Sequence, residues 1–312
     1  MLLGFRFPRR WFPYRHRPGQ AMPTQIMREI FGWAAAAGFS GCELSTAHQD
    51  FPGFSDGQLD AVAGLLADAG LKAAAYNPGG FRLHGDGGDA AARTRELVGS
   101  ARIAARLGAP TINLTLPGPG TGGGPSAVPS EYLVGARHPL GSGRGRPPSE
   151  AAALAQSLGE LADACADSGI DVSLEIHQNS YIEDSVAALS LLGRIDRPNV
   201  GLNPDLGNIL WARAIPYESH EEAIERLAPH AIYVHMKNLR RVFVAGLDRA
   251  AFVRTSLLER GDIDWRWALS VLNAAGFRGF LTFEGDYAEG WDFRRAMECN
   301  AEYVRGLVAD LE

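Results

Sequence analysis

Residues 150–176, EAAALAQSLGELADACADSGIDVSLEI, contain the repeating unit on which the fold depends. The first part, residues 150–168, is amphipathic and rich in Ala and Leu, which is typical of a helix that packs one face on a core. The last part, residues 171–176, is a short and mostly apolar run that predicts a buried strand. Gly169 stands between them, where a left-handed residue ends a helix. The stretch therefore predicts a helix, a glycine turn and a strand.

The same order of helix, glycine and strand recurs along the chain. Gly38, Gly70, Gly108 and Gly276 each follow a predicted helix and precede a predicted strand. Eight strands are expected, at residues 2–7, 41–45, 71–76, 111–116, 171–176, 199–203, 231–237 and 279–284. Helices are expected at residues 24–37, 56–69, 90–107, 150–168, 184–192, 265–275 and 293–311. A doubly wound open sheet uses the same α/β unit, so the count of eight strands is what favours a single (β/α)8 TIM barrel over residues 1–312.

Two connections are too long for a simple turn, and both follow strands at the face where barrel enzymes hold their active sites. Residues 117–149 include PGPGTGGGP and PLGSGRGRPP, and they form either a surface insertion or a cover over substrate. Residues 238–264 have more apolar side chains and are expected to form an ordered lid with a helical piece near 252–258. The alternative for this second connection is a surface for dimerisation or for another partner.

Composition excludes several classes of protein. The chain has 312 residues, and its net charge of −6 gives no positive field for binding nucleic acid. The three cysteines are far apart and odd in number, which argues against a disulfide framework or a thiolate metal site. No apolar stretch has the length of a signal peptide or a membrane helix, so the protein is expected to be cytoplasmic and without a membrane partner.

Four acidic or imidazole side chains fall at the ends of the last four predicted strands: Glu175, Asp205, His235 and Glu284. A carboxylate inside a barrel is unfavourable to bury unless it is paired or bound to a cation. Because consecutive strand ends converge on one point, these residues are candidate ligands of one divalent metal ion. Three carboxylates and an imidazole suit manganese first, with magnesium, cobalt or zinc as alternatives. The alternative is that each residue is a polar strand end that caps a helix or faces water.

Five short motifs resemble the xylose isomerase-like barrels, a superfamily of sugar isomerases and epimerases, inosose dehydratases and related metal enzymes. The motifs are LEIHQNS, NPDLGNI, YVHMKN, GDIDW and GFRGFLTFEGDY, within residues 170–290. The resemblance implies that Glu175, Asp205, His235 and Glu284 bind the metal. It also implies, from the ketose epimerases, that the two glutamates exchange protons next to a carbonyl through an enediolate that the metal stabilises.

The chain departs from the epimerase pattern at two positions. Asn208 stands where those enzymes usually have a histidine, and it can hydrogen-bond a substrate hydroxyl but cannot act as an acid or base. Tyr181 stands where they have a second glutamate. Arg241 lies where the relatives have an arginine that contacts substrate, although Arg240 beside it leaves the register ambiguous.

Other candidates follow from the alternation of side chains along strands. His177 shares the parity of Glu175 and is a candidate base or substrate contact, with a structural role as the alternative. Lys237 is a candidate to stabilise an enolate oxygen, or else a solvated strand end. Glu43, Tyr76 and Asn77 are expected to reach the barrel mouth and bind sugar hydroxyls.

Three hypotheses for function remain open. The first is a metal-dependent isomerase or epimerase of a free sugar, keto-sugar or cyclitol. The second is a lyase on the same scaffold, either a keto-polyol dehydratase or an enzyme that cleaves 3-keto-glycosides, because elimination also needs an acid for the leaving group. The third is a barrel without catalysis that binds a ligand or serves in a complex. The expected partner is a small sugar or polyol, and a homo-oligomer or heteromer is also open.

Overall fold

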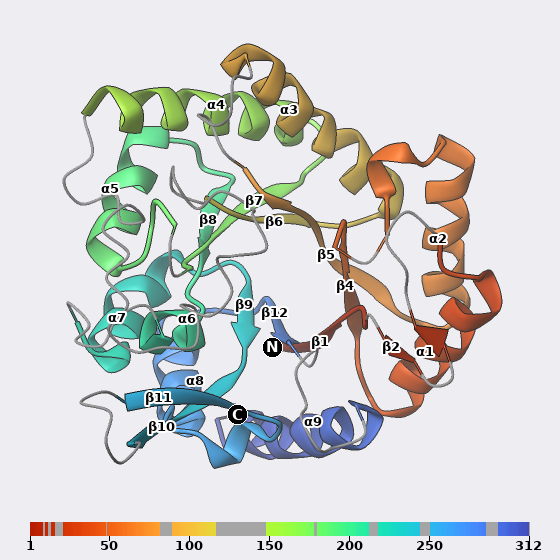
Figure 1. Ribbon diagram of the computed structural model, residues 1–312, viewed down its shortest axis with the longest axis vertical. Helices are drawn as coiled ribbons and strands as arrows, with labels where there is room; N and C mark the ends of the chain where they lie inside the picture. Colours follow the sequence, from red (N-terminus) through yellow and green to blue (C-terminus); the bar gives the residue numbers. More distant parts are fainter. Residues whose placement is uncertain are drawn as a thin grey trace.

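Eight parallel strands form one sheet at the centre of the molecule, and helices surround it (Figure 1). The computed structural model describes residues 1–8, 10–11, 14–15, 21–47, 49–81, 89–116, 148–177, 180–211, 218–243, 250–284 and 293–311. The strands of the sheet are β1 (Leu2–Arg6), β4 (Gly41–Ser45), β5 (Lys72–Gly80), β6 (Thr111–Thr115), β7 (Asp171–Glu175), β8 (Val200–Asn203), β9 (Val234–Met236) and β12 (Phe280–Phe283). Their order is β8-β7-β6-β5-β4-β1-β12-β9.

The two end strands of this order meet and close the sheet. Leu202 of β8 forms a parallel bridge with Ala231, three residues before β9 begins. The backbone N–H of Ile232 donates to the carbonyl oxygen of Leu202 at 3.1 Å. Because every strand of the sheet then has a neighbour on both sides, the predicted (β/α)8 barrel is confirmed.

Seven helices correspond to the predicted ones: α1 (Thr24–Ala36), α2 (Asp56–Asp68), α3 (Ala90–Leu107), α4 (Pro148–Ala166), α5 (Ser185–Ile195), α8 (Trp265–Ala274) and α9 (Phe293–Ala309). The five glycines that were expected to end helices all have positive φ angles, between 64° and 87°. Glycine adopts this conformation without the steric penalty that a Cβ would bring. The sequence thus predicted these seven helices and the glycines that end five of them.

Two further helices lie between β8 and β9, where the sequence analysis assigned none. They are α6 (Leu206–Trp211) and α7 (His220–Leu227), and the turn η4 (Ala228–His230) follows them. Other short elements are η1 (Phe51–Gly53) and the paired β2 (Arg10–Trp11) and β3 (Tyr14–Arg15). Among the helices of the described ranges, none is both long and apolar enough to cross a membrane.

The prediction of a helical piece near residues 252–258 is wrong. β10 (Asn238–Phe243) and β11 (Ala250–Thr255) form an antiparallel hairpin there, and the turn η5 (Leu258–Arg260) follows it. The Asn238 side chain fixes the base of this hairpin, because its amide donates to the carbonyl oxygens of Leu258 at 2.6 Å and Ile263 at 2.9 Å. Pairing the two segments satisfies backbone groups that lie outside the barrel sheet. Of the other long connection, residues 117–147 lie outside the described residues.

The amino ends of the strands are closed by aromatic side chains inside the barrel. Phe280 of β12 packs there with Tyr233 in a small buried cluster. Gly41 of β4 leaves room for the Phe280 ring, because a Cβ at this position would lie 2.7 Å from Cε1 of Phe280 and 2.9 Å from the carbonyl oxygen of Lys72. The barrel floor therefore depends on the absence of a side chain on β4.

Gly41→Ala should destabilise the protein by about 1–3 kcal/mol, because the added methyl group overpacks a site that backbone atoms partly enclose. The measurement is the free energy of unfolding from a denaturant titration. Gly64→Ala is the matched control, since Gly64 lies in α2 with no atom within 4 Å of the added Cβ. It should stabilise the protein by about 0.5–1 kcal/mol. Equal stability of the two variants would contradict the packing argument.

Candidate metal centre

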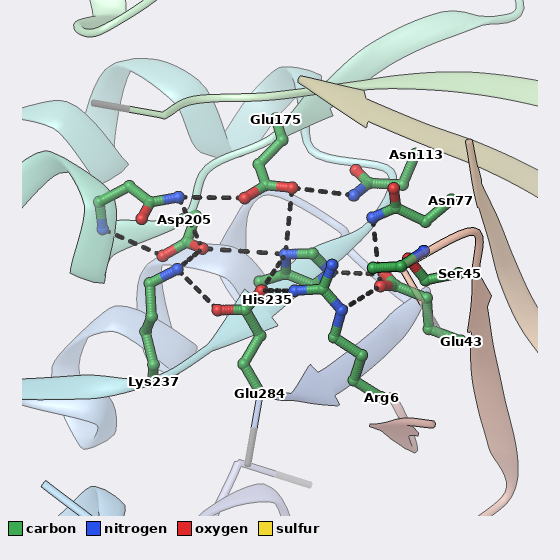
Figure 2. A network of polar contacts seen from close by, with 12 residues as sticks. Arg6, Glu43, Ser45, Asn77, Asn113, Glu175, Asp205, His235, Lys237 and Glu284 are labelled. Carbon is green, nitrogen blue, oxygen red and sulfur yellow. Dashed lines mark hydrogen bonds and ion pairs between the residues drawn. The ribbon is translucent and has the colours of Figure 1, made fainter. Parts of the chain in front are cut away.

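The four predicted ligands come together at the carboxyl ends of the strands. One ligand atom from each of Glu175, Asp205, His235 and Glu284 lies within 4.8 Å of the others. Figure 2 shows these side chains pointing toward one another, with the imidazole in the middle. All four are nearly or fully buried. The group can therefore hold one metal ion among oxygen and nitrogen donors.

The orientation of His235 fits a metal. Its Nε2 lies 2.6 Å from Oε2 of Glu43. Its Nδ1 lies 3.3 Å from Glu175, 3.5 Å from Glu284 and 3.8 Å from Asp205, yet it has no hydrogen-bond partner. A proton on Nε2 leaves the lone pair of Nδ1 directed at the three carboxylates. A buried nitrogen without a partner among acidic oxygens is the position that a bound cation satisfies.

Glu43 holds the far side of the imidazole. Its carboxylate is fully buried; Oε2 also accepts from the Tyr233 hydroxyl at 3.0 Å, and Oε1 accepts from the Asn77 amide at 3.2 Å. The guanidinium of Arg6 lies 3.1 Å from Oε1. The sequence predicts a sugar contact for Glu43, but its oxygens are engaged by protein groups. The geometry indicates that it positions His235.

Two buried asparagines, Asn113 and Asn203, form a chain of hydrogen bonds that ends on Glu175. Neither was predicted from the sequence. The Asn113 amide donates to Oε2 of Glu175 at 3.1 Å, and the Asn203 amide donates to Oδ1 of Asn113 at 3.2 Å. Oδ1 of Asn203 accepts from the backbone N–H of His235 at 2.8 Å. The available signal was an asparagine at the centre of one buried strand, TINLT, and at the end of another, VGLN.

Asn208 on α6 joins two of the candidate ligands. Its Nδ2 lies 3.0 Å from Oε1 of Glu175, from Oδ2 of Asp205 and from the carbonyl oxygen of Ile176. All three neighbours are hydrogen-bond acceptors, so the NH2 group of the Asn208 amide, and not its oxygen, must face them. Asn208 therefore orients carboxylates at the place where the resemblance leads one to expect a histidine.

Three cations surround Glu284. The ammonium of Lys237 lies 2.8 Å from Oε2 of Glu284 and 2.5 Å from Oδ2 of Asp205. Nη2 of Arg254 lies 2.6 Å from the same Oε2, and Nη1 of Arg6 lies 2.5 Å from Oε1. Lys237 is among the site residues predicted from the sequence, whereas Arg6 and Arg254 are not. Lys237 is almost fully buried, so it is not a solvated strand end.

Within the β10–β11 hairpin, the arginine that binds a candidate ligand comes from β11 and not from β10. Arg241 of β10 has an exposed side chain, and its backbone N–H donates to Oδ2 of Asp262 at 2.7 Å. Arg254 of β11 reaches Glu284 across the hairpin. The predicted substrate contact of Arg241 stays a prediction.

The expectation that Tyr76 reaches the barrel mouth is wrong. The pairing of β4 with β5 skips Ala74, which forms a bulge, and this extra residue reverses which side chains of β5 face inward. Asn77 then points into the barrel, where its amide donates to Glu43, and its predicted contact with a sugar hydroxyl stays a prediction. Tyr76 is fully buried in the layer between sheet and helices, with its ring edge-to-face on Phe51 at 6.0 Å between centroids.

His177 lies two residues after β7, and its side chain is half-buried. Burial alone would raise the pKa of Glu175, but the charges of His235 and, less strongly, of His177 lower that pKa to about 2. The His177 imidazole is therefore near enough to act on Glu175. Its backbone N–H donates to the carbonyl oxygen of Ile182 at 3.2 Å, which holds the start of the following loop.

Charges within the centre also shift the pKa values of the other groups. Burial disfavours a charged imidazole, but the neighbouring carboxylates, Glu43 first, raise the pKa of His235 well above its usual range. Burial also opposes charge on Glu284, yet the surrounding cations, Lys237 first, hold its pKa well below normal. The pKa of Asp205 is raised because burial outweighs the attraction of Lys237. A metal ion would compete with a proton for Nδ1 of His235, so metal binding would release protons.

Glu43→Gln should weaken metal affinity by about 10–100-fold while leaving one ion per chain, because the carboxylate that orients His235 loses its charge. The measurement is a metal titration by calorimetry. Glu218→Gln is the matched control: Glu218 is a buried carboxylate that accepts from the backbone N–H of Ser185 at 2.6 Å and lacks any described contact with His235. Unchanged affinity in Glu43→Gln would remove Glu43 from this role.

Several solved structures share the fold of this chain at low sequence identity. A xylose isomerase-like TIM barrel protein from Mycobacterium smegmatis in complex with magnesium is 21% identical, with a TM-score of 0.74 over 95% of this chain and 94% of that one. An L-ribulose 3-epimerase is 16% identical, with a TM-score of 0.70 over 99% and 95%. The probable 3-DHS dehydratase AsbF from Bacillus anthracis is 16% identical, with a TM-score of 0.66 over 98% and 99%.

No curated protein matches the sequence significantly. The sequence model of the xylose isomerase-like TIM barrel family matches residues 31–303, which is most of the chain. The protein therefore belongs to the xylose isomerase-like TIM barrel family.

Proposed function

We propose that the protein is a divalent-metal-dependent isomerase or epimerase that moves a proton at the carbon next to a carbonyl of a small sugar, keto-sugar or cyclitol. The observation that carries this proposal is the unpartnered Nδ1 of His235 among three buried carboxylates. Membership of the family and the fold of an L-ribulose 3-epimerase support the same class of reaction.

The donor set favours manganese, with magnesium, cobalt and zinc as alternatives. His235, Glu175, Asp205 and Glu284 would hold the ion. When bound, it polarises the carbonyl and hydroxyl oxygens of a substrate and so makes the neighbouring C–H more acidic. The structure of the Mycobacterium smegmatis protein with magnesium supports a hard divalent ion in this family.

Glu175 is the proposed base. Amides of Asn113 and Asn208 bind its two oxygens at 3.1 and 3.0 Å, so the carboxylate is fixed in direction but keeps no permanent cation among these partners. Glu284 is the proposed partner on the other face of the reacting carbon. Lys237 stabilises negative charge that develops on a substrate oxygen, since it is buried and carries a proton at neutral pH.

A lyase is the second candidate, and two observations favour it. His177 follows Glu175 by two residues at the end of β7, and its imidazole would supply the acid for a leaving group that elimination requires. Glu284 is bound by three cations, which weaken it as a base for two-sided proton exchange. The probable dehydratase AsbF shares the fold. Both candidates begin with loss of the same proton, and they differ in what leaves afterwards.

Elemental analysis should find about one divalent ion per chain. Candidate keto-sugars should then be incubated with the metal-loaded protein in deuterated water and followed by proton NMR. Deuterium entering next to the carbonyl, without loss of any group, supports the isomerase or epimerase, whereas release of water or an alcohol supports the lyase. A chain with no ion and no exchange would contradict both.

Glu175→Gln should reduce the rate of deuterium exchange by about 10²–10⁴-fold, because the amide cannot accept the proton. Glu284→Gln should also reduce turnover, and more strongly for an epimerase than for a lyase. Glu160→Gln is the control, since Glu160 is an exposed carboxylate on α4 whose described partner is Gln156. A Glu175→Gln variant that folds, binds metal and keeps its rate would show that another group takes the proton.

A further inference from the structure

The number of cations at Glu284 exceeds what one carboxylate needs. Arg6 comes from β1, Lys237 follows β9 and Arg254 comes from β11, so three separate elements deliver positive charge to one point. Their side chains are 20%, 4% and 13% exposed, respectively. Arg6 and Lys237 each also bind a second carboxylate, Glu43 and Asp205.

The charge balance of the described centre changes when a metal binds. Four carboxylates, those of Glu43, Glu175, Asp205 and Glu284, stand against three cationic side chains and the imidazole of His235, which carries a proton when no ion is bound, so the charges balance. A divalent ion, with neutral His235 as its ligand, would leave one positive charge in excess. A buried and uncompensated charge is unfavourable, so the loaded centre attracts an anion.

We propose that Arg254, together with Lys237 and Arg6, forms an anion subsite beside the metal centre, and that the substrate carries a carboxylate there. The substrate would then be an acidic sugar derivative or a hydroxy-keto acid instead of a neutral sugar. A single carboxylate matches the one surplus charge, and its two oxygens match the planar guanidinium groups. This inference rests on the proposed function, because the surplus exists only with the ion bound.

The hairpin holds Arg254 in place for this role. Arg254 pairs with Leu239, which is fully buried, so this face of the hairpin turns toward the barrel. The next pair, Arg240 and Val253, lies on the opposite face, where both side chains are exposed. The position of Arg254 is thus set by strand register and a buried neighbour, which distinguishes it from a mobile surface arginine.

Lys237 is likewise accommodated by a specific close approach. A Cβ on Gly207 would lie within 2.4 to 3.0 Å of three carbon atoms of the Lys237 side chain. The absence of a side chain at Gly207, in the first turn of α6, therefore leaves room for the lysine side chain to reach Asp205 and Glu284. Two separate elements, α6 and the β10–β11 hairpin, thus set the positions of Lys237 and Arg254.

Dihydroxyacetone and hydroxypyruvate make a matched pair of probes, because they differ only in a hydroxymethyl group against a carboxylate and have no stereocentre. Calorimetric titration of the metal-loaded protein should show hydroxypyruvate binding at least about tenfold more tightly, as expected for a charge-assisted contact. Arg254→Gln should abolish this preference without changing metal content, and Arg254→Lys should keep part of it. Arg240→Gln, which removes the same charge from the outer face of the hairpin, should keep it fully.

Three outcomes would overturn the subsite. These are equal affinity for the two probes, no binding of hydroxypyruvate, or a preference that survives both Arg254→Gln and Lys237→Met, which would mean that the carboxylate binds the ion alone. Lys237→Met also serves as the second variant if Arg254→Gln fails to fold. With any of these three outcomes, the proposed function would still hold if the wild-type protein binds one ion and exchanges deuterium into neutral keto-sugars. A chain that binds no ion would overturn both.

Discussion

Burial of four carboxylates around one imidazole is the constraint on which the rest of this structure depends. Glu43, Asp205 and His235 are fully buried, and Glu175 and Glu284 nearly so. Like charges this close in a medium of low dielectric would drive the barrel mouth open unless each were compensated. The asparagines on β6 and β8, the amide on α6 and the cations from β1, β9 and β11 supply that compensation. The elements around the centre therefore serve mainly to place positive charges and hydrogen-bond donors next to the buried carboxylates.

The compensation makes the two glutamates chemically unequal. Glu175 is bound by neutral amides, and the positive charge that most lowers its pKa comes from His235. That charge is lost when the imidazole binds a metal through Nδ1 as a neutral ligand. Glu284 keeps its cationic neighbours, led by Lys237, in either state. Two carboxylates of similar position thus have different basicity, as in other enzymes where environment separates an acid from a base.

The sequence predicted the features that repeat and missed those that depend on one distant contact. Helix ends at glycines and the parity of side chains on strands are local, so the eight strands and the group around His235 followed from spacing alone. The bulge at Ala74 inserts one residue, and no local pattern marks it; Tyr76 was therefore assigned to the wrong face. Arg254 reaches Glu284 only because β11 folds back on β10, a pairing that the helical interpretation of this segment excluded.

The three cations at Glu284 affect the free energy of metal binding. Two unit charges about 4 Å apart interact by about 4 kcal/mol at an effective dielectric of 20, and a divalent ion doubles this interaction, so Lys237 and the two arginines would oppose metal binding. A centre selected for metal affinity alone would lack them, because amides orient carboxylates without this repulsion, as Asn208 does for Glu175 and Asp205. Cations beside a candidate metal site therefore support the proposal that a third, negatively charged component completes the site. Negative charge enters such a site either on the substrate itself or on the oxygen that gains charge as the proton leaves.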